Sequence, residues 1–258
     1  ISQPRVGAAQ RSDLLRRLRR PAPLHADTFQ LASDFTPNLS EIQYRNAFER
    51  IQAYINAGDC YQVNLSQQFS ASFQGDPWEA YRLLRAVAAA PFSAFTDSDE
   101  DTAVLCLSPE RFISLHGQHV ETSPIKGTRP RYTDPKADRM AIEALRNSSK
   151  DRAENLMIVD LLRNDLGRNC VPGSIHVDRL FEIQSFPTVH HLVSTISGEL
   201  DPTRNAFDLL RDSFPGGSIT GAPKRRAMEI IAELEPHSRE VYCGSVFYIS
   251  ADGRMDSN

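Results

Sequence analysis

Residues 112–122 read Phe-Ile-Ser-Leu-His-Gly-Gln-His-Val-Glu-Thr and decide the fold class of this 258-residue chain. Short strands are predicted at Phe112–Leu115 and His119–Thr122, and His116-Gly117 supplies the tight turn between them. Strand-like stretches at 92–95 and 104–107 precede this hairpin, so the region is expected to form an antiparallel meander.

Helices are predicted on both sides of the meander. Ser40 and Gln43 form a capping box that starts a helix reaching Gly58. Further helices are expected at 76–90, from 134, at 149–166, near 206–211 and at 223–234, with strands at 61–66, 175–183, 191–200 and 241–249. Because the strands come in hairpin-linked runs that do not alternate with helices, the predicted class is α+β with antiparallel sheets.

The net charge, the apolar runs and the cysteines argue against several classes of protein. Lys+Arg 29 against Asp+Glu 33 gives a net charge of -4, which makes nucleic acid a poor first hypothesis. The longest apolar run with a single interruption, 156–162, contains Asp160 and is far shorter than the ~20 residues of a membrane span, so no membrane segment is expected. Four dispersed cysteines without a C-x-x-C pair suggest neither a zinc site nor disulfides, and favour the cytoplasm.

The two ends of the chain suggest an internal piece of a longer protein. It begins at Ile1, and it stops soon after Ala251-Asp252-Gly253, a turn from which a returning strand should start. Residues 1–38 are polar and Arg-rich and are expected to be a linker or N-terminal remnant with a short solvated helix at 14–20. Residues 39–258 are expected to be the catalytic domain, incomplete at its C-terminus.

Three charged side chains are candidates for chemistry. Lys126 lies in Pro124–Thr128, which is predicted to be a rigid loop after a strand. To act as a nucleophile its amine must be neutral, and desolvation favours the neutral form. The alternative is an ordinary solvated lysine. Glu110, between two strands, is either a general acid or a surface partner of Arg111. Glu154 lies near the start of the helix at 149–166, which is apolar nearly all round beyond residue 155 and is expected to be buried, so Glu154 needs either an arginine or a hard cation such as Mg²⁺.

Two further segments are candidates for binding. Phe214–Lys224 is a glycine-rich segment ending at a helix N-terminus, where backbone N–H groups suit a carboxylate or a phosphate. It lacks the Lys-Ser/Thr that a P-loop requires. His190 and His191 alternate on a strand, so at most one of them faces a given site.

Together these segments resemble the chorismate-utilising enzymes over residues 40–258. The resemblance rests on six stretches in one order: 58–67, 108–112, 124–129, 151–165, 189–194 and 214–224. It implies an antiparallel β-sandwich core flanked by helices. Within the family the chain is most similar to the branch that forms aminodeoxychorismate for p-aminobenzoate and folate. Members that form anthranilate carry Ala at position 126, and isochorismate-forming members carry Lys at position 62, where this chain has Gln62.

The resemblance also implies roles for individual residues. Lys126 adds to C2 of chorismate while Glu110 protonates the departing C4 hydroxyl, and ammonia from a glutamine amidotransferase partner then enters at C4. His191 lies near that hydroxyl, and Glu154 is a Mg²⁺ ligand. Substrate contacts are implied for Gly127, Thr128, Thr220, Gly221, Ala222 and Tyr248, and contacts to bound tryptophan for Phe92, Ser93 and Ala94.

Members of the family continue beyond the position of Asn258 with a second Mg²⁺ carboxylate and a substrate-binding arginine. The 258-residue piece is therefore expected to be inactive alone. An anthranilate-forming enzyme and a non-catalytic scaffold remain as alternatives.

Overall fold

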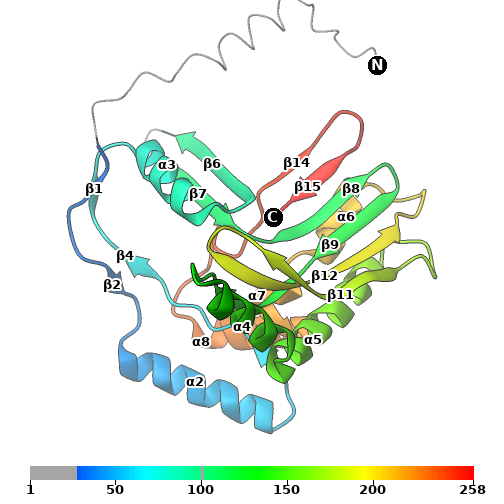
Figure 1. The fold of residues 1–258 in the computed structure, drawn as a ribbon, viewed down its shortest axis with the longest axis horizontal. Coiled ribbons are helices and arrows are strands. Elements are labelled where there is room, and N and C mark those ends of the chain that lie inside the picture. The colour runs from blue at the N-terminus through cyan, green and yellow to red at the C-terminus, as the bar shows by residue number, and fades with distance from the viewer. Residues whose placement is uncertain (1–27, 100–101) are drawn as a thin grey trace, which may run out of the picture.

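The computed structural model describes residues 28–99 and 102–258, and its centre is an antiparallel sheet of seven strands (Figure 1). The order is β10-β12-β9-β8-β15-β14, with β11 also paired to β12. These strands are β8 (Arg111–His116), β9 (His119–Ser123), β10 (Ile125–Pro130), β11 (His176–Ser185), β12 (Val189–Glu199), β14 (Phe247–Ile249) and β15 (Met255–Ser257). The predicted hairpin at 112–122 is confirmed, since His116 pairs with His119 across the turn.

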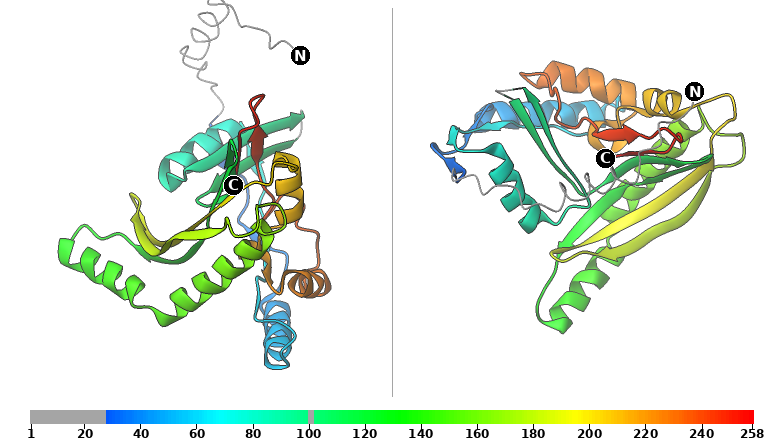
Figure 2. Two further views of the ribbon diagram at one scale, coloured as in Figure 1. Left: turned by 90° about the vertical axis from the view of Figure 1, so that its right-hand side faces the viewer. Right: turned by 90° about the horizontal axis from the view of Figure 1, so that it is seen from above.

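Two helices cover one face of this sheet. Figure 2 (left) shows α4 (Pro135–Arg146) and α5 (Ser149–Leu166) along that face, and α5 contacts both β10 and β12. The core between them is apolar, and full burial of each such side chain is worth about 1.5–3 kcal/mol. It includes Ile113, Val120, Ile158, Leu162 and Ile196. The expected α+β class with antiparallel sheets is confirmed.

Helix α5 is buried along one face only. Ile158 and Leu162 are buried, whereas Leu156 is 45% exposed and Asp160 and Arg163 form an ion pair on the outer surface. The expectation of a helix buried nearly all round is therefore wrong. The hydrophobic run at 156–162 reflects a stripe that packs on the sheet, with the remaining residues facing outward.

The N-terminal part adds helices outside the main sheet. Helix α2 (Glu41–Asn56) starts at the predicted Ser40 capping box. Helix α3 (Pro77–Ala88) packs against the hairpin of β6 (Phe92–Asp99) and β7 (Thr102–Ser108), where Trp78, Tyr81 and Phe95 form an aromatic cluster.

Residues 28–38 pair with a later segment. Strand β1 (Gln30–Leu31) pairs with β5 (Phe73–Gln74), and β2 (Thr36–Pro37) pairs with β4 (Phe69–Ser70). This part of the expected linker is thus tied to the segment that follows α2. The boundary between residues 38 and 39 stays a prediction, and the helix expected at 14–20 lies outside the described residues.

Several boundaries differ from the predictions near the glycine-rich segment. Within the stretch 61–66 only β3 (Gln62–Val63) is paired, and its partner is β13 (Gly221–Ala222). The glycine-rich segment at 214–224 contains a short helix, α7 (Gly217–Thr220), before α8 (Lys224–Leu234) begins. Helix α6 (Ala206–Ser213) precedes it as predicted.

The strand expected at 241–249 begins only at Phe247. Two tight turns precede it, in which Tyr242 N–H donates to Arg239 O and Gly244 N–H donates to Val241 O. Beyond it, the turn predicted at 251–253 is confirmed, because β14 and β15 pair on either side of it. Among the helices of the described part of the chain, none is long and apolar enough to span a membrane.

Candidate active site

Lys126 lies on a bulged strand. Along β10, Ile125 pairs with Val193 and Thr128 pairs with His191, so two residues of β10 lie opposite one residue of β12. Such a bulge re-aims a side chain relative to its strand. The expected loop at 124–128 is therefore the start of a strand whose irregularity is at Lys126-Gly127.

Gly127 makes this bulge possible. Its φ is +89°, a conformation that residues with a side chain rarely adopt, and a Cβ there would lie 2.9 Å from Asp151 Cβ. The close approach lets Asp151, at the start of α5, pair with Arg129 at 2.9 Å. The backbone around Lys126 is thereby fixed against a helix end.

The amine of Lys126 contacts a distant backbone carbonyl. Its Nζ donates to Ser218 O at 2.9 Å, and Asn64 Nδ2 donates to the same oxygen at 2.6 Å. Three segments thus meet at one carbonyl: the bulge of β10, the residue after β3, and helix α7.

Glu110 is brought to the same place. Burial raises the pKa of its carboxyl, and this effect outweighs the lowering influence of the Lys126 charge, the Ser218 side chain and the Ile125 backbone N–H. A raised pKa favours the protonated form of the carboxyl, and that form suits proton donation. The structure therefore unites two of the three sequence-predicted catalytic residues around Ser218.

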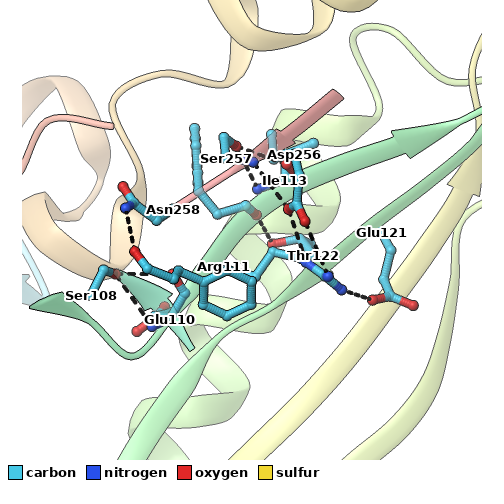
Figure 3. A network of polar contacts seen from close by, with 11 residues as sticks. Ser108, Glu110, Arg111, Ile113, Glu121, Thr122, Asp256, Ser257 and Asn258 are labelled. Carbon is cyan, nitrogen blue, oxygen red and sulfur yellow. Dashed lines mark hydrogen bonds and ion pairs between the residues drawn. The ribbon is translucent and has the colours of Figure 1, made fainter. Parts of the chain in front are cut away.

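Arg111 does not pair with Glu110. Figure 3 shows its guanidinium between two other carboxylates, Glu121 at 2.8 Å and Asp256 at 3.1 Å. The alternative interpretation of Glu110 as a surface partner of Arg111 is wrong, because Glu110 lies in the bend before β8 and the Arg111 guanidinium is occupied by Glu121 and Asp256.

A cavity of about 510 Å³ opens beside Glu110. Glu110 and Ser218 are among its lining residues, and most of the remaining lining is apolar, including Leu107, Phe112 and Ile219. A mostly apolar cavity of this size with a few polar groups is typical of a small-molecule site.

The two adjacent histidines face opposite sides of β12, as predicted. His190 is fully buried between Ser185 Oγ and Asp138 Oδ1, both at 2.8 Å, which is a structural environment. His191 Nδ1 lies 2.9 Å from Thr128 Oγ1, two residues beyond Lys126. Burial lowers the pKa of His191, which favours the neutral ring.

The glycine-rich segment is held mainly by internal bonds. Thr220 is buried and its hydroxyl donates to Gly216 O at 2.9 Å, while the Gly221 N–H donates to Gly217 O. The Gly221 amide is therefore already partnered here, and a substrate contact by it or by Ala222 stays a prediction. At the end of the segment, Lys224 Nζ lies 2.6 Å from Asp165 Oδ2, a buried carboxylate of α5.

Gln62 lies beside this cluster with one polar atom unpartnered. Its Nε2 donates to Asn64 Oδ1 at 3.3 Å, while its buried Oε1 has no hydrogen-bond partner among the described residues. Gln62 is thereby linked through Asn64 to the Ser218 carbonyl that Lys126 contacts.

Glu154 lies apart from a complete metal site. Its side chain is 38% exposed, and Lys150 Nζ is 3.9 Å from Oε1. Among the described residues, there is no group of three or more His, Cys, Asp or Glu side chains that could hold a metal ion. A carboxylate is a suitable Mg²⁺ ligand, but one carboxylate does not make a Mg²⁺ site, so these residues alone do not fit the ion.

The remaining predicted residues are not brought to Lys126 and Glu110. Tyr248 on β14 is 61% exposed and does not line the cavity beside Glu110. Phe92 packs under the Arg111 guanidinium at 5.2 Å, Ser93 Oγ donates to Ala90 O, and Ala94 pairs with Cys106. A tryptophan site at these three residues stays a prediction.

Two residues of the site, Asn64 and Ser218, were not singled out from the sequence. The period-two polar face at 62–66 could have indicated Asn64. Ser218 contributes its backbone carbonyl, a group that every residue has, so its role cannot be read from the residue type.

Comparison with known proteins identifies a family. Residues 3–258 match the model of the chorismate binding enzymes. Aminodeoxychorismate synthase component 1 of Salmonella typhimurium is 56% identical over 89% of this chain and 50% of its own length. Anthranilate synthase component 1 of Streptomyces coelicolor is 44% identical over 86% and 43%.

A solved structure agrees with these relatives. Anthranilate synthase component I from Streptococcus pneumoniae superposes with a TM-score of 0.83 at 36% identity, covering 95% of this chain and 55% of that one. The chain spans about half the length of the curated relatives it matches. On the match over residues 3–258, the chain belongs to the chorismate binding enzyme family.

Proposed function

We propose that the whole protein aminates chorismate at C4, forming aminodeoxychorismate and water on the way to p-aminobenzoate and folate. The observation that supports this most directly is the meeting of an amine, Lys126, and a carboxyl with a raised pKa, Glu110, at Ser218. An amine and an acid are the two groups that covalent displacement of a hydroxyl requires.

In the first step the Lys126 amine adds to C2 of the chorismate ring. The ring double bonds shift and the C4–O bond breaks, while Glu110 gives its proton to the departing oxygen, which leaves as water. Protonation is needed because hydroxide is a poor leaving group. The raised pKa of Glu110 favours the protonated form that this step requires.

In the second step ammonia adds to C4 and the double bonds shift back. The C2–N bond to Lys126 breaks, the lysine regains its free amine, and a proton lost by the incoming nitrogen restores Glu110. The sum is chorismate plus ammonia giving aminodeoxychorismate plus water. His191, with its lowered pKa, is neutral beside this chemistry and can donate or accept one hydrogen bond.

Ammonia is proposed to come from a partner. The name "component 1" of the relatives implies a second component, and we propose a glutamine amidotransferase that releases ammonia to this protein in the cytoplasm.

The test is identification of the product. The complete protein is incubated with chorismate, ammonium and Mg²⁺, and the products are identified by mass spectrometry. Aminodeoxychorismate is expected. Anthranilate as the main product would overturn the proposal in favour of the other branch of the family. Calorimetric binding of chorismate without any product would instead identify a scaffold.

Glu154 is proposed as one Mg²⁺ ligand of the complete protein. Mg²⁺ prefers six oxygen ligands, so water, substrate or other carboxylates must supply the rest. Glu154→Gln keeps the shape but removes the charge, and the apparent Kd for Mg²⁺ is expected to rise roughly 10-fold or more. Thermal shift with Mg²⁺, with and without chorismate, measures this.

The matched control for Glu154→Gln is Glu143→Gln. Glu143 is an exposed carboxylate of α4 that pairs with Arg146. An unchanged Mg²⁺ response in Glu154→Gln would remove this residue from the metal site.

A further inference from the structure

Arg239 links the two backbone segments that meet at Lys126. Its Nη2 donates to Asn64 O at 2.5 Å and its Nη1 donates to Ile219 O at 2.9 Å. Asn64 and Ser218, the neighbour of Ile219, provide the amide and the carbonyl described above. The guanidinium therefore fixes the spacing between the strand segment and helix α7.

Arg239 is itself held by a buried carboxylate. Glu235 accepts from Arg239 Nη2 at 2.6 Å and from Nε at 2.9 Å, and the two side chains are only 5% and 15% exposed, respectively. Glu235 also accepts from the backbone N–H and the hydroxyl of Ser66, each at 2.8 Å. Burial acts to raise the pKa of Glu235, but these hydrogen bonds outweigh it and the net pKa is lowered, so the pair is charged.

We propose that Arg239 is a positioning residue for the Lys126 amine, acting through the carbonyl of Ser218. This inference rests on the nucleophilic role proposed for Lys126. Arg239 acts indirectly. It donates hydrogen bonds to the carbonyls of Asn64 and Ile219, and these contacts position the Ser218 carbonyl that accepts the hydrogen bond from Lys126 Nζ. The orientation of the Lys126 amine thus depends on hydrogen bonds from Arg239, which lies 113 positions away in sequence.

The planar fork of arginine is needed for this arrangement. Four hydrogen bonds leave the Arg239 guanidinium in fixed directions, two to Glu235 and two to separate carbonyls. A lysine has one compact ammonium group on a flexible stem and cannot span these acceptors together. Arg239→Lys therefore keeps the charge beside Glu235 while releasing the segment around Ser218.

The experiment is Arg239→Lys in the complete protein, with two readouts. The kcat for the chorismate reaction is expected to fall about 10²-fold with little change in KM, because misplacement of a reacting group by about 1 Å has this cost. Labelling of Lys126 by trinitrobenzenesulfonate, followed by peptide mass spectrometry, is expected to accelerate several-fold once the amine is less firmly held.

Arg225→Lys is the matched control on the helix that precedes Arg239, α8. Arg225 is 95% exposed and pairs only with Glu229 among the described residues, so both readouts are expected to match the parent protein. Glu235→Gln is the second variant. This variant weakens the hydrogen bonds between Glu235 and Arg239 but leaves the hydrogen bonds from Arg239 to the carbonyls of Asn64 and Ile219. An intermediate effect on both readouts is therefore expected.

These outcomes separate positioning from a merely structural role. Unchanged Lys126 labelling in folded Arg239→Lys, or a loss of kcat that simply follows the loss of thermal stability across the two variants, would overturn the inference. The labelling requires no chorismate. Failure of the proposed function in the product assay is therefore distinguishable from failure of Arg239 to position Lys126.

Discussion

Replacement of Lys126 by Ala is expected to lower the rate of aminodeoxychorismate formation by at least about 10³-fold, because the proposed reaction loses its nucleophile. The fold is expected to survive. Asn64 Nδ2 remains 2.6 Å from Ser218 O, so the carbonyl that Lys126 contacts keeps a donor. Any residual product is expected to be of the anthranilate type, since the variant segment then reads Pro-Ile-Ala-Gly-Thr as in anthranilate-forming members.

The measurement is single-turnover kinetics with mass-spectrometric product analysis on the complete protein. Lys126→Arg serves as a companion, because it keeps the positive charge but not the nucleophile, and a loss as large as that of the Ala variant is expected. Lys136→Ala, an exposed position on α4, is the matched control and is expected to retain full activity. Undiminished synthesis by Lys126→Ala would remove the residue from the mechanism.

The sequence predicted the elements whose signals are local. The capping box of Ser40, the Asp76 and Asp134 caps followed by proline, and the turn at His116-Gly117 each specify their boundary within a few residues. The hairpin-linked strands were therefore recognised as antiparallel. These features do not depend on what the segment packs against.

The prediction failed where long-range pairing determines the structure. Residues 125–130 contain proline and glycine at positions typical of a loop, yet β12 supplies a partner strand and the Gly127 bulge accommodates the mismatch. Likewise Gly221 has a φ of +142° and its Cβ position would lie 2.1 Å from Gln62 O, so its conformation is determined by β3, about 160 residues earlier. Local propensity carries no information on such partners.

The same distinction applies to the candidate site. Lys126, Glu110 and His191 were identified from residue type and from a family resemblance, and the structure brings the first two to Ser218. The buried support, Arg239 with Glu235, was missed because an arginine four residues after a glutamate is also the pattern of an exposed helical pair. Only the tertiary structure shows that this pair is buried and holds two backbone segments.

Glu110→Gln is expected to separate activity from stability. The amide is nearly the same shape as the carboxyl but cannot protonate a departing hydroxyl, so the rate should fall by about 10²–10⁴-fold. The folded state should nevertheless become more stable near neutral pH. Burial raises the pKa of Glu110, which means that ionisation of this carboxyl opposes folding.

The sign and the pH window of this effect follow from the raised pKa. Below the ordinary value of 4.5 the carboxyl is protonated in both the folded and unfolded states, and Glu110 carries no ionisation penalty. As pH rises above 4.5, Glu110 ionises first in the unfolded chain, while it stays protonated in the folded protein. The free energy of unfolding therefore falls as pH rises from 4.5 through the folded-state pKa of Glu110. Gln has no such titration, so the stability advantage of the variant should grow as pH rises above 4.5 and level off above the folded-state pKa of Glu110.

Thermal unfolding of both proteins across pH 4.5 to 8 measures this difference, with Glu143→Gln as the exposed carboxylate control. A Tm advantage of Glu110→Gln that increases with pH, together with lost activity, is the expected pair of results. Equal Tm values at all pH values would show that Glu110 ionises freely in the folded protein. A carboxylate of that kind would have no proton to give the leaving hydroxyl at neutral pH, and the acid of the proposed reaction would have to be another group.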